Sequence, residues 1–372
     1  MEAFLISEFW ESMETHVALA PGESVEGLQM FLEREFGEQG WCLFQTSGSE
    51  GEPKWVALTK EKLLASARAV NAHYDITGRD HWLLALPTHH VGGFGIVARA
   101  FLSGSPVTRL QGKWDAAAFV RRCAEVGATL ASLVPAQVFD LVAAKLKAPK
   151  SMRVVLVGGG ALSPEIEASA LQLGWPVRRT YGMTETASQV ASQRMADGEM
   201  EVLPIWSLST DDEGVLSVRG KALAAGYASH ESGKWHWEPI STETGLRTRD
   251  RVSLHCDSGR SFLRFIGREM GMVKILGELV SLGPIQQRID DLRLKFGFTH
   301  GDAAVCDVPD PRKESRLVLA VSGLTPKQAS QLQKGLNDSL RPLERVDDVC
   351  RLDAIPRGDL SKVRLQELRA RL

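Results

Sequence analysis

Hydroxyl side chains, glycines and one lysine are concentrated between residues 46 and 54, a pattern suited to phosphate binding. The candidate phosphate-binding residues are Thr46, Ser47, Gly48, Ser49, Gly51 and Lys54. Glycine lets the backbone approach a ligand closely, backbone N–H groups and hydroxyls donate to oxyanions, and a lysine adds a positive charge. Pro53 excludes the Walker A pattern, which needs a glycine directly before the lysine. The stretch predicts a loop that wraps a phosphate chain; the alternative is a polar hairpin loop with an incidental lysine.

A second polar cluster, residues 181–186, directly follows an apolar stretch typical of a strand. Its candidate residues are Tyr181, Gly182, Met183, Thr184 and Glu185. The aromatic ring can stack on a base, the hydroxyls can reach phosphates, and a carboxylate can hold Mg²⁺ together with a nucleotide's own oxygens. Read as structure alone, the same residues are a polar turn after a strand.

Taken in order, these motifs resemble those of the adenylate-forming superfamily, the acyl-CoA synthetases and adenylation domains. Four further segments share the resemblance, namely residues 158–161, 248–250, 267–278 and 356–364. It implies ATP and coenzyme A as substrates, Mg²⁺ as cofactor and acyl-adenylate formation as the first reaction. It also implies a metal ligand at Glu185, catalysis by Glu185, Thr184 and Lys362, ribose binding by Asp250, and nucleotide binding by Tyr181, Gly182, Met183, Gly159, Gly160, Ala161, Arg268 and Lys274.

Four positions depart from the superfamily motifs. Glu50 and Arg249 stand where a hydroxyl residue and a glycine are usual, and Met270 and Gly271 replace two aspartates. We expect Glu50 and Arg249 to compensate each other as an ion pair, since a lone carboxylate would repel phosphate. Met270 occupies the hinge position of the resemblance. The departures also motivate a rival hypothesis, a nucleotide-binding protein without turnover.

Two segments resemble the acyl-side motifs of one branch, the 2-succinylbenzoate–CoA ligases of menaquinone and phylloquinone synthesis. They are residues 86–95 and 132–137, and their candidate substrate-binding residues are His90, Gly93, Ser132 and Pro135. His90 has an alternative role as a packed, hydrogen-bonded wall residue. The segments leave open a ligase for another aryl or acyl carboxylate.

These residues need a scaffold, and the spacing of apolar residues predicts one. From residue 41 to 181 short apolar runs alternate with helical patterns, with helices expected over residues 60–74, 96–102, 115–126, 135–146 and from Ser163. Such alternation indicates a doubly wound parallel sheet, whose ligands collect at the carboxyl ends of the strands. Polar or glycine-rich segments stand at several of those ends.

Beyond residue 201 short alternating runs predict an antiparallel β part, followed by a smaller α+β region. We therefore expect an α/β fold with an AMP-binding domain over residues 1–267 and a mobile C-terminal domain over 268–372 that carries Lys362. Residues 1–40 are expected to be a helical lead-in. The resemblance also implies that the region ahead of the phosphate loop is shorter here than in usual members of the superfamily.

The composition sets outer limits on function. With 372 residues and a net charge of −2, the chain is long enough for two domains and offers no electrostatic case for nucleic acid. We expect no signal peptide and no membrane insertion, because the start lacks a basic region and no apolar run is long enough. The five scattered cysteines predict reduced thiols in a cytoplasmic protein. Partners are a small-molecule carboxylate, ATP and coenzyme A, and a homo-oligomer stays open.

Overall fold

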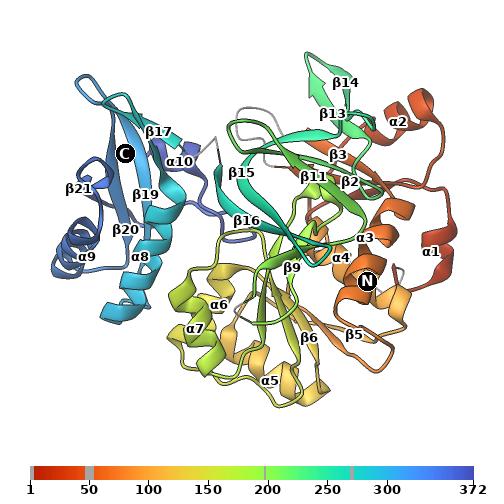
Figure 1. Cartoon of the computed structure of the whole chain (residues 1–372), viewed down its shortest axis with the longest axis horizontal. Coiled ribbons are helices and arrows are strands. Elements are labelled where there is room, and N and C mark those ends of the chain that lie inside the picture. The colour runs from red at the N-terminus through yellow and green to blue at the C-terminus, as the bar shows by residue number, and fades with distance from the viewer. Residues whose placement is uncertain (1–3, 47–53, 197, 269–271) are drawn as a thin grey trace. The chain divides into compact units, whose positions relative to one another are not determined.

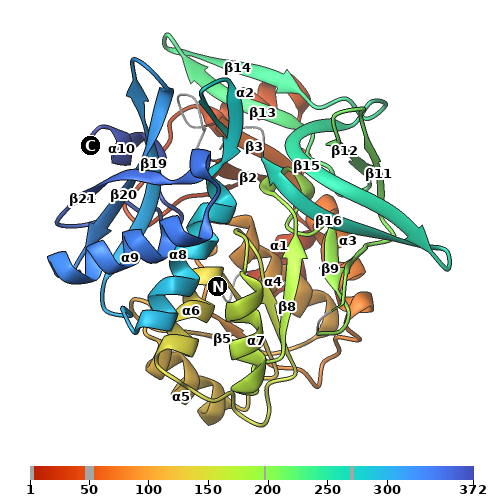
Figure 2. The same ribbon diagram turned by 60° about the vertical axis from the view of Figure 1, so that its left-hand side comes forward.

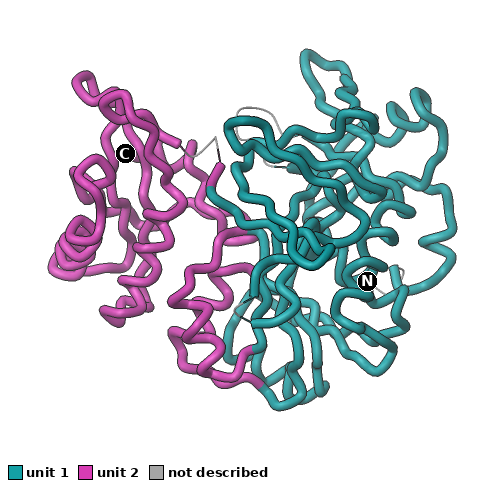
Figure 3. Tube along the Cα trace, viewed as in Figure 1, with its two compact units in different colours: residues 1–133, 149–159, 176–266 teal, residues 134–148, 160–175, 267–372 magenta. Residues whose placement is uncertain are grey.

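The computed structural model describes residues 4–46, 54–196, 198–268 and 272–372. The chain forms two compact units, coloured teal and magenta in Figure 3. Unit 1 comprises residues 1–133, 149–159 and 176–266, and unit 2 comprises residues 134–148, 160–175 and 267–372. Within the described ranges, no helix has the length and apolar character that a membrane crossing requires. The fold is mixed α/β, as predicted.

The largest sheet contains five parallel strands in the order β8-β7-β6-β4-β5, of which Figure 1 labels β5 and β6. They are β4 (Trp82–Leu84), β5 (Val107–Arg109), β6 (Leu130–Leu133), β7 (Val154–Val157) and β8 (Val177–Tyr181). β4 pairs with β5 on one edge and with β6 on the other, so the order of strand addition reverses at β4. In parallel α/β sheets such a reversal opens a crevice at the carboxyl ends of the strands, where ligands bind. The predicted parallel layer is confirmed for these strands.

The same sheet continues with six strands that pair antiparallel with their neighbours. Their order, starting at β8, is β9-β10-β16-β15-β12-β11. They are β9 (Ala191–Gln193), β10 (Met200–Val202), β11 (Trp206–Thr210), β12 (Val215–Gly220), β15 (Leu246–Asp257) and β16 (Arg260–Arg268). The antiparallel part is thus confirmed, and in the sheet order β9, β10 and β16 lie between β8 and β15.

A separate five-stranded sheet corrects one prediction. The apolar runs at residues 41–44 and 55–58 fell within the stretch that was expected to form the parallel layer. They lie instead on β2 and β3, which pair antiparallel in a sheet of order β1-β2-β3-β13-β14 (Figures 1 and 2). The strands are β1 (His16–Ala18), β2 (Trp41–Thr46), β3 (Lys54–Thr59), β13 (Gly226–Glu231) and β14 (Lys234–Pro239). A loop of a few residues joins β2 to β3, which suits an antiparallel pair, whereas parallel strands need a long crossover.

The helices of residues 60–175 begin largely as the capping residues predict. Thr59, Asp115 and Ser163 each accept a hydrogen bond from a backbone N–H three residues on, which satisfies one donor of the first turn. The helices are α3 (Lys60–His73), α4 (Val91–Ser103), α5 (Ala116–Val126), α6 (Pro135–Ala143) and α7 (Pro164–Gln172). The predicted start of one helix at residue 96 was wrong, because the glycines ahead of it are helical and α4 begins at Val91.

The N-terminal segment of unit 1 packs onto the core through aromatic rings. It contains α1 (Ser7–Glu11) and α2 (Leu28–Phe36) besides β1. The Phe94 ring of α4 stacks with the His16 imidazole and contacts the rings of Phe4 and Trp10. α2 buries Leu28 and Leu32 among apolar side chains of the five-stranded sheet. Residues 4–36 therefore complete the core of unit 1.

Unit 2 has a three-stranded sheet in the order β19-β20-β21, against which two helices pack side by side (Figure 2). These elements are β19 (Asp302–Asp310), β20 (Glu314–Ser322), β21 (Val346–Arg351), α8 (Leu282–Phe296) and α9 (Pro326–Ser339). A hairpin of β17 (Met272–Ile275) and β18 (Glu278–Ser281) precedes them, and α10 (Leu365–Arg369) follows. Ile289, Leu319 and Leu332 are fully buried in its core.

Candidate active site

Tyr181 and Asp250 meet in the interior of unit 1. Tyr181 is the last residue of β8, and its hydroxyl donates to Oδ2 of Asp250 on β15 at 2.8 Å. The Asp250 side chain is buried, and its backbone N–H donates to the Thr248 hydroxyl. The Phe265 ring lies 6.0 Å from the Tyr181 ring. The structure thus joins two predicted nucleoside-binding residues, an aromatic ring and a carboxylate, in one hydrogen-bonded pair.

The chain after β8 makes a tight turn that only glycine allows at its start. A Cβ on Gly182 would lie 1.8 Å from the carbonyl oxygen of Ser188, far inside van der Waals contact. Thr184 opens a short 3-10 helix, residues 184–186, and the Thr186 hydroxyl accepts from the N–H of Met183. Ala187 adopts a left-handed conformation (φ 51°). The turn fixes the backbone of Glu185, whose carbonyl also accepts from the N–H of Ala224 at 2.7 Å.

The Glu185 carboxylate meets a tyrosine that also contacts Lys54. The Tyr227 hydroxyl, on β13, donates to Oε1 of Glu185 at 3.0 Å. Nζ of Lys54 lies 5.5 Å from the centre of the Tyr227 ring and 2.7 Å from Oε2 of Glu238. Burial raises the pKa of Tyr227, and the Glu185 charge raises it further, so the phenol stays protonated. Glu185, the predicted metal ligand, thus contacts the hydroxyl of Tyr227, and Lys54, at one end of the predicted phosphate loop, lies over its ring.

The phosphate loop itself lies mostly outside the described residues. Ser47, Gly48, Ser49, Glu50 and Gly51 belong to that part, so the expected Glu50–Arg249 pair does too. Thr46, the last residue of β2, is described, and its hydroxyl donates to the carbonyl of Lys54 at 3.2 Å. The ends of β2 and β3 therefore hold the two ends of the loop together.

Arg249 is exposed and lies between two buried residues of β15, Thr248 and Asp250. Successive side chains of a strand point to opposite faces, so Arg249 faces away from the Tyr181–Asp250 pair. The arginine side chain, which replaces the glycine of the superfamily motif, therefore does not occupy the space around Tyr181 and Asp250.

The acyl-side residues stand at the reversal point of the parallel sheet. His90 is the N-cap of α4, and its carbonyl accepts from the N–H of Gly93. A Cβ on Gly93 would lie 2.2 Å from the carbonyl oxygen of Pro87, so α4 can approach this loop only with glycine there. Ser132 is buried on β6, the strand next to β4, and among the described residues its hydroxyl has no hydrogen-bond partner.

Arg99 is a fully buried cation in the apolar helix α4. Its guanidinium donates to the Ser188 hydroxyl at 3.0 Å, and in the described part of the chain no carboxylate lies within ion-pair distance of it. Burial lowers the pKa of Arg99 to about 10, which still leaves it charged at neutral pH. An unneutralised buried charge is costly unless a ligand pairs with it.

A small hollow adjoins the acyl-side motif. It measures about 170 Å³ and is lined by Thr88 and His89, next to His90, and by residues of the N-terminal segment including Phe4 and His16. The N-terminal segment therefore borders the loop that carries His90.

The remaining glycine-turn residues follow β7. Gly159 is in the left-handed region (φ 77°), where glycine is favoured. In unit 2, a Cβ on Gly160 would meet the Pro135 ring at 3.5 Å, an ordinary contact, and Ala161 follows it in the chain. Pro135 itself is the first residue of α6.

Three further predicted residues, from the C-terminal part of the chain, also belong to unit 2. Arg268 ends β16, and Lys274 on β17 pairs with Glu314 at 3.1 Å. Lys362 lies in a loop whose base is closed by a bridge between Arg357 and Val363, and its carbonyl accepts from the N–H of Gly358. Met270 and Gly271 lie outside the described residues.

A bidentate ion pair anchors the loop of Lys362. The Arg357 guanidinium donates to both carboxylate oxygens of Asp302, at 2.7 and 2.8 Å, and also to the carbonyl of Ser361. Burial opposes the charge on Arg357, but the bonds to Asp302 outweigh it and raise the pKa of Arg357. The loop backbone is therefore fixed relative to the sheet of unit 2.

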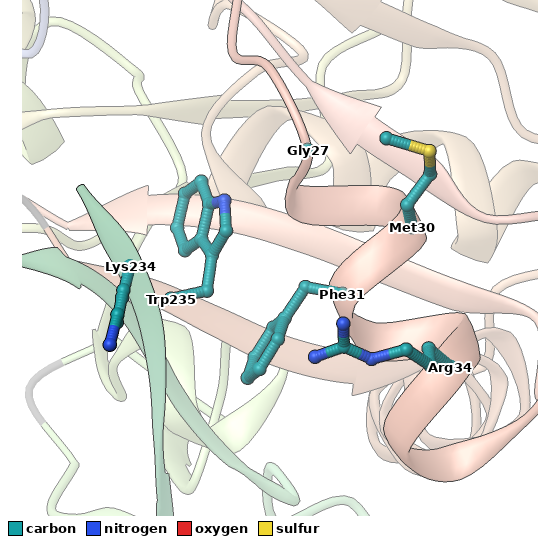
Figure 4. A pocket seen from close by; sticks show the side chains of 6 residues that line it. All are labelled: Gly27, Met30, Phe31, Arg34, Lys234 and Trp235. Atoms are coloured by element: carbon teal, nitrogen blue, oxygen red, sulfur yellow. The ribbon is translucent and has the colours of Figure 1, made fainter.

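A larger hollow of about 670 Å³ lies over α2 and β14 (Figure 4). It is lined by Gly27, Met30, Phe31, Arg34, Lys234 and Trp235. Figure 4 shows the Phe31 and Trp235 rings side by side at its centre, with Arg34 and Lys234 on either side. None of the predicted site residues that the structure describes lines it.

Sequence reasoning did not single out Tyr227, which contacts Glu185, or Arg99, which contacts Ser188 in the turn after Glu185. Arg99 had a signal, a single charge within a strongly apolar, glycine-rich helix. Tyr227 had none, because the strand that carries it is short and joins β3 from far along the chain.

The chain is similar in sequence to known proteins. Residues 37–228, just over half of the chain, match the family model described as AMP-binding enzyme. Over 162 residues the chain is 34% identical to a 2-succinylbenzoate–CoA ligase of Enterococcus faecalis. The aligned stretch covers 43% of this chain and 33% of that protein. The chain thus spans about a third of the length of this relative.

Solved structures show the same fold. The o-succinylbenzoate CoA synthetase of Bacillus subtilis, in complex with its acyl-adenylate intermediate, has a TM-score of 0.74 at 23% identity, covering 88% of this chain and 68% of that one. The same synthetase in complex with ATP and magnesium ion has a TM-score of 0.70 at 22% identity, over 88% and 69% of the two chains. With a family model matching more than half of its residues, the chain belongs to the AMP-binding enzyme family.

Proposed function

We propose that the chain is an AMP-forming acid–CoA ligase. In the first half-reaction a substrate carboxylate oxygen attacks the α-phosphorus of ATP, and pyrophosphate leaves. In the second, the thiolate of coenzyme A attacks the acyl carbonyl, and AMP leaves. The observation that carries this proposal is that Glu185 and Lys54 both contact Tyr227, within the same unit as the Tyr181–Asp250 pair.

The nucleotide would use groups that fit its chemistry. The Asp250 carboxylate can accept hydrogen bonds from the ribose hydroxyls, and the Tyr181 ring offers a face for the base. Lys54 adds positive charge at the base of the phosphate loop, and the glycine turn at Gly159 and Gly160 is proposed to lie on the adenine side. These roles follow the family resemblance and are supported by the contacts of Tyr181 and Asp250.

Glu185 would hold Mg²⁺ together with the phosphates. Mg²⁺ binds one or two carboxylates plus phosphate oxygens, and Glu185 offers one carboxylate oxygen that accepts no hydrogen bond from the described residues. When bound, the ion supplies positive charge that neutralises the phosphates. Thr184, directly beside Glu185, is proposed to reach the phosphates through its hydroxyl.

For the acid, we propose a substrate with two carboxylates, 2-succinylbenzoate. The name of the sequence relatives supports this choice, and so does the buried Arg99, whose charge suits a second carboxylate. His90, Gly93, Ser132 and Pro135 are proposed to line the acyl side. A ligase for another aryl or acyl acid is the alternative, and a monocarboxylic acid would leave Arg99 without a partner charge.

The proposal extends to the whole molecule. We propose that residues 268–372 act as a mobile domain that brings Lys362 to the reacting atoms in the first half-reaction, with Arg268 and Lys274 binding the nucleotide. A cytoplasmic location is in line with the cysteines, all five of which are free thiols.

A test is the exchange of labelled pyrophosphate into ATP, measured with a panel of carboxylic acids that includes 2-succinylbenzoate, benzoate and fatty acids. We expect exchange with the diacid, and AMP release only when coenzyme A is added as well. Exchange with a different acid, and none with 2-succinylbenzoate, would overturn the substrate assignment. Tight nucleotide binding without exchange for any acid would instead support the rival, a nucleotide-binding protein without turnover.

A further inference from the structure

Tyr227 contacts both a predicted metal ligand, Glu185, and a predicted phosphate-loop lysine, Lys54, but has no assigned role of its own. We propose that Tyr227 is a positioning residue, which orients the Glu185 carboxylate toward the divalent cation and holds the Lys54 ammonium over its ring. This inference rests on the proposed function and deepens it. The two contacts that carry it are the hydrogen bond of the Tyr227 hydroxyl to Glu185 and the position of the Lys54 ammonium over the Tyr227 ring.

The hydrogen bond determines which oxygen of Glu185 is available. Oε1 accepts from the Tyr227 hydroxyl at 3.0 Å, and in the described ranges Oε2 accepts no hydrogen bond and makes no ion pair. A carboxylate side chain has free rotation about its last bonds, and fixing one oxygen removes much of that freedom. The remaining oxygen is then held in one orientation before the cation arrives, which reduces the entropy lost on binding.

The direction of this hydrogen bond is set by charge. A carboxylate can only accept a hydrogen bond, whereas a phenol hydroxyl can donate one, so the Tyr227 hydroxyl is the donor to Glu185. The ring face attracts the Lys54 ammonium, which also pairs with Glu238. Tyr227 therefore contacts a cation with its ring and an anion with its hydroxyl.

The backbone keeps these groups in register. β13 pairs antiparallel with β3, and Tyr227 stands opposite Val56, two residues from Lys54 on the same face of β3. The carbonyl of Glu185 accepts from the N–H of Ala224, three residues before Tyr227. Both partners of Tyr227 are thus tied to the strand that carries it, through main-chain hydrogen bonds that a side-chain substitution leaves in place.

The chain offers a control in Tyr74, a buried tyrosine outside this cluster, whereas Tyr227 is partly buried. The Tyr74 hydroxyl also makes buried hydrogen bonds, to Ser192 and to the carbonyl of Gln193, but contacts neither Glu185 nor Lys54. Tyr74→Phe and Tyr227→Phe each remove one hydroxyl and keep the ring. They therefore separate a general loss of stability from a specific effect on the cation.

The experiment is a titration of Mn²⁺, followed by its electron paramagnetic resonance, into the full chain saturated with α,β-methylene ATP. We expect Tyr227→Phe to weaken Mn²⁺ binding about tenfold, since a hydrogen bond to a charged group is lost. Tyr74→Phe should leave Mn²⁺ affinity unchanged. In the Glu185→Gln background, Tyr227→Phe should have little further effect, because Tyr227 acts through that carboxylate.

Equal Mn²⁺ affinity for the wild type and Tyr227→Phe would overturn the inference while leaving the proposed function standing. So would an equal loss in both tyrosine variants, or an undiminished effect of Tyr227→Phe in the Glu185→Gln background. A wild-type chain that binds no Mn²⁺ with the nucleotide analogue would contradict the proposed function itself, and the inference with it.

Discussion

At the scale of single residues, a strongly perturbed imidazole lies in the N-terminal segment. His16 on β1 stacks on the Phe94 ring at 5.4 Å and meets the Phe4 ring edge-on at 4.9 Å. Burial lowers the pKa of His16 to about 4, and the nearby Lys60 charge contributes. His16 is therefore neutral in the folded protein at neutral pH, although an unfolded histidine titrates near pH 6.5.

This depressed pKa predicts acid sensitivity. Below about pH 6.5 the unfolded chain takes up a proton at His16 that the folded chain refuses, so the free energy of unfolding falls as the pH drops toward 4. The full effect is at most about 3 kcal/mol. In His16→Phe, which keeps a ring but cannot titrate, this part of the pH dependence should be missing. Urea unfolding between pH 7 and 4.5 measures it.

The control for that experiment is His300→Phe, at an exposed histidine of unit 2. Its unfolding free energy should follow the wild type at every pH. Parallel pH curves for wild type and His16→Phe would contradict the assignment, and would mean that His16 is already protonated or solvated in the folded state.

The sequence predicted those site residues whose chemistry is carried by a local motif. Tyr181, Glu185 and Asp250 lie in such motifs, and the structure joins Tyr181 to Asp250. Tyr227 could not be found this way, because its role depends on strand pairing between residues far apart in sequence. A local pattern encodes a turn or a helix face, whereas a contact between distant strands depends on the whole fold.

At the scale of elements, two neighbouring glycines of α4 differ in the room they leave for a side chain: Gly92 has space for a Cβ and Gly93 has none. A Cβ on Gly92 would meet only the Leu86 side chain, at 3.7 Å, whereas one on Gly93 would lie 2.2 Å from the Pro87 carbonyl oxygen. Gly92→Ala should stabilise the protein by about 0.5–1 kcal/mol, the usual gain for alanine over glycine in a helix. Gly93→Ala should destabilise it by about 1–3 kcal/mol through overpacking.

Denaturant unfolding of the two variants provides the measurement, with each serving as the control for the other. Because α4 begins at the residue that follows His90, Gly93→Ala should also lower the rate of acyl-adenylate formation, and Gly92→Ala should not. Similar stability changes of the two variants would show that the loop at Pro87 yields to an added methyl group.

The predicted elements differ from the observed ones for identifiable reasons. Helix caps at Thr59, Asp115 and Ser163 are local signals, and they were read correctly. The start of α4 was misplaced because glycine usually interrupts helices, while here close packing against a loop requires it. The pairing of β3 with β13 carries no local signal, so β2 and β3 were assigned to the wrong sheet.

At the scale of the whole molecule, the two half-reactions should depend differently on Lys362. Lys362→Ala should slow acyl-adenylate formation by about a hundredfold or more, because a cation that stabilises developing negative charge is lost. Thioester formation from a preformed adenylate should be nearly unchanged. Single-turnover assays of each half-reaction measure the two rates.

The control for this experiment is Lys327→Ala, which removes an exposed lysine of the same unit. It should leave both rates as in the wild type. An equal loss in both half-reactions of Lys362→Ala would show that Lys362 has no special role in adenylate formation.

The strand order β1-β2-β3-β13-β14 also has a consequence for synthesis on the ribosome. One edge of β3 pairs with β13, whose first residue, Gly226, is made long after Thr59. At 5–20 residues per second, the apolar strand Lys54–Thr59 emerges on the order of ten seconds before its neighbour exists. During that interval its open edge can pair with other nascent chains. Slower initiation at low temperature, which spaces the nascent chains, should therefore raise the yield of folded protein.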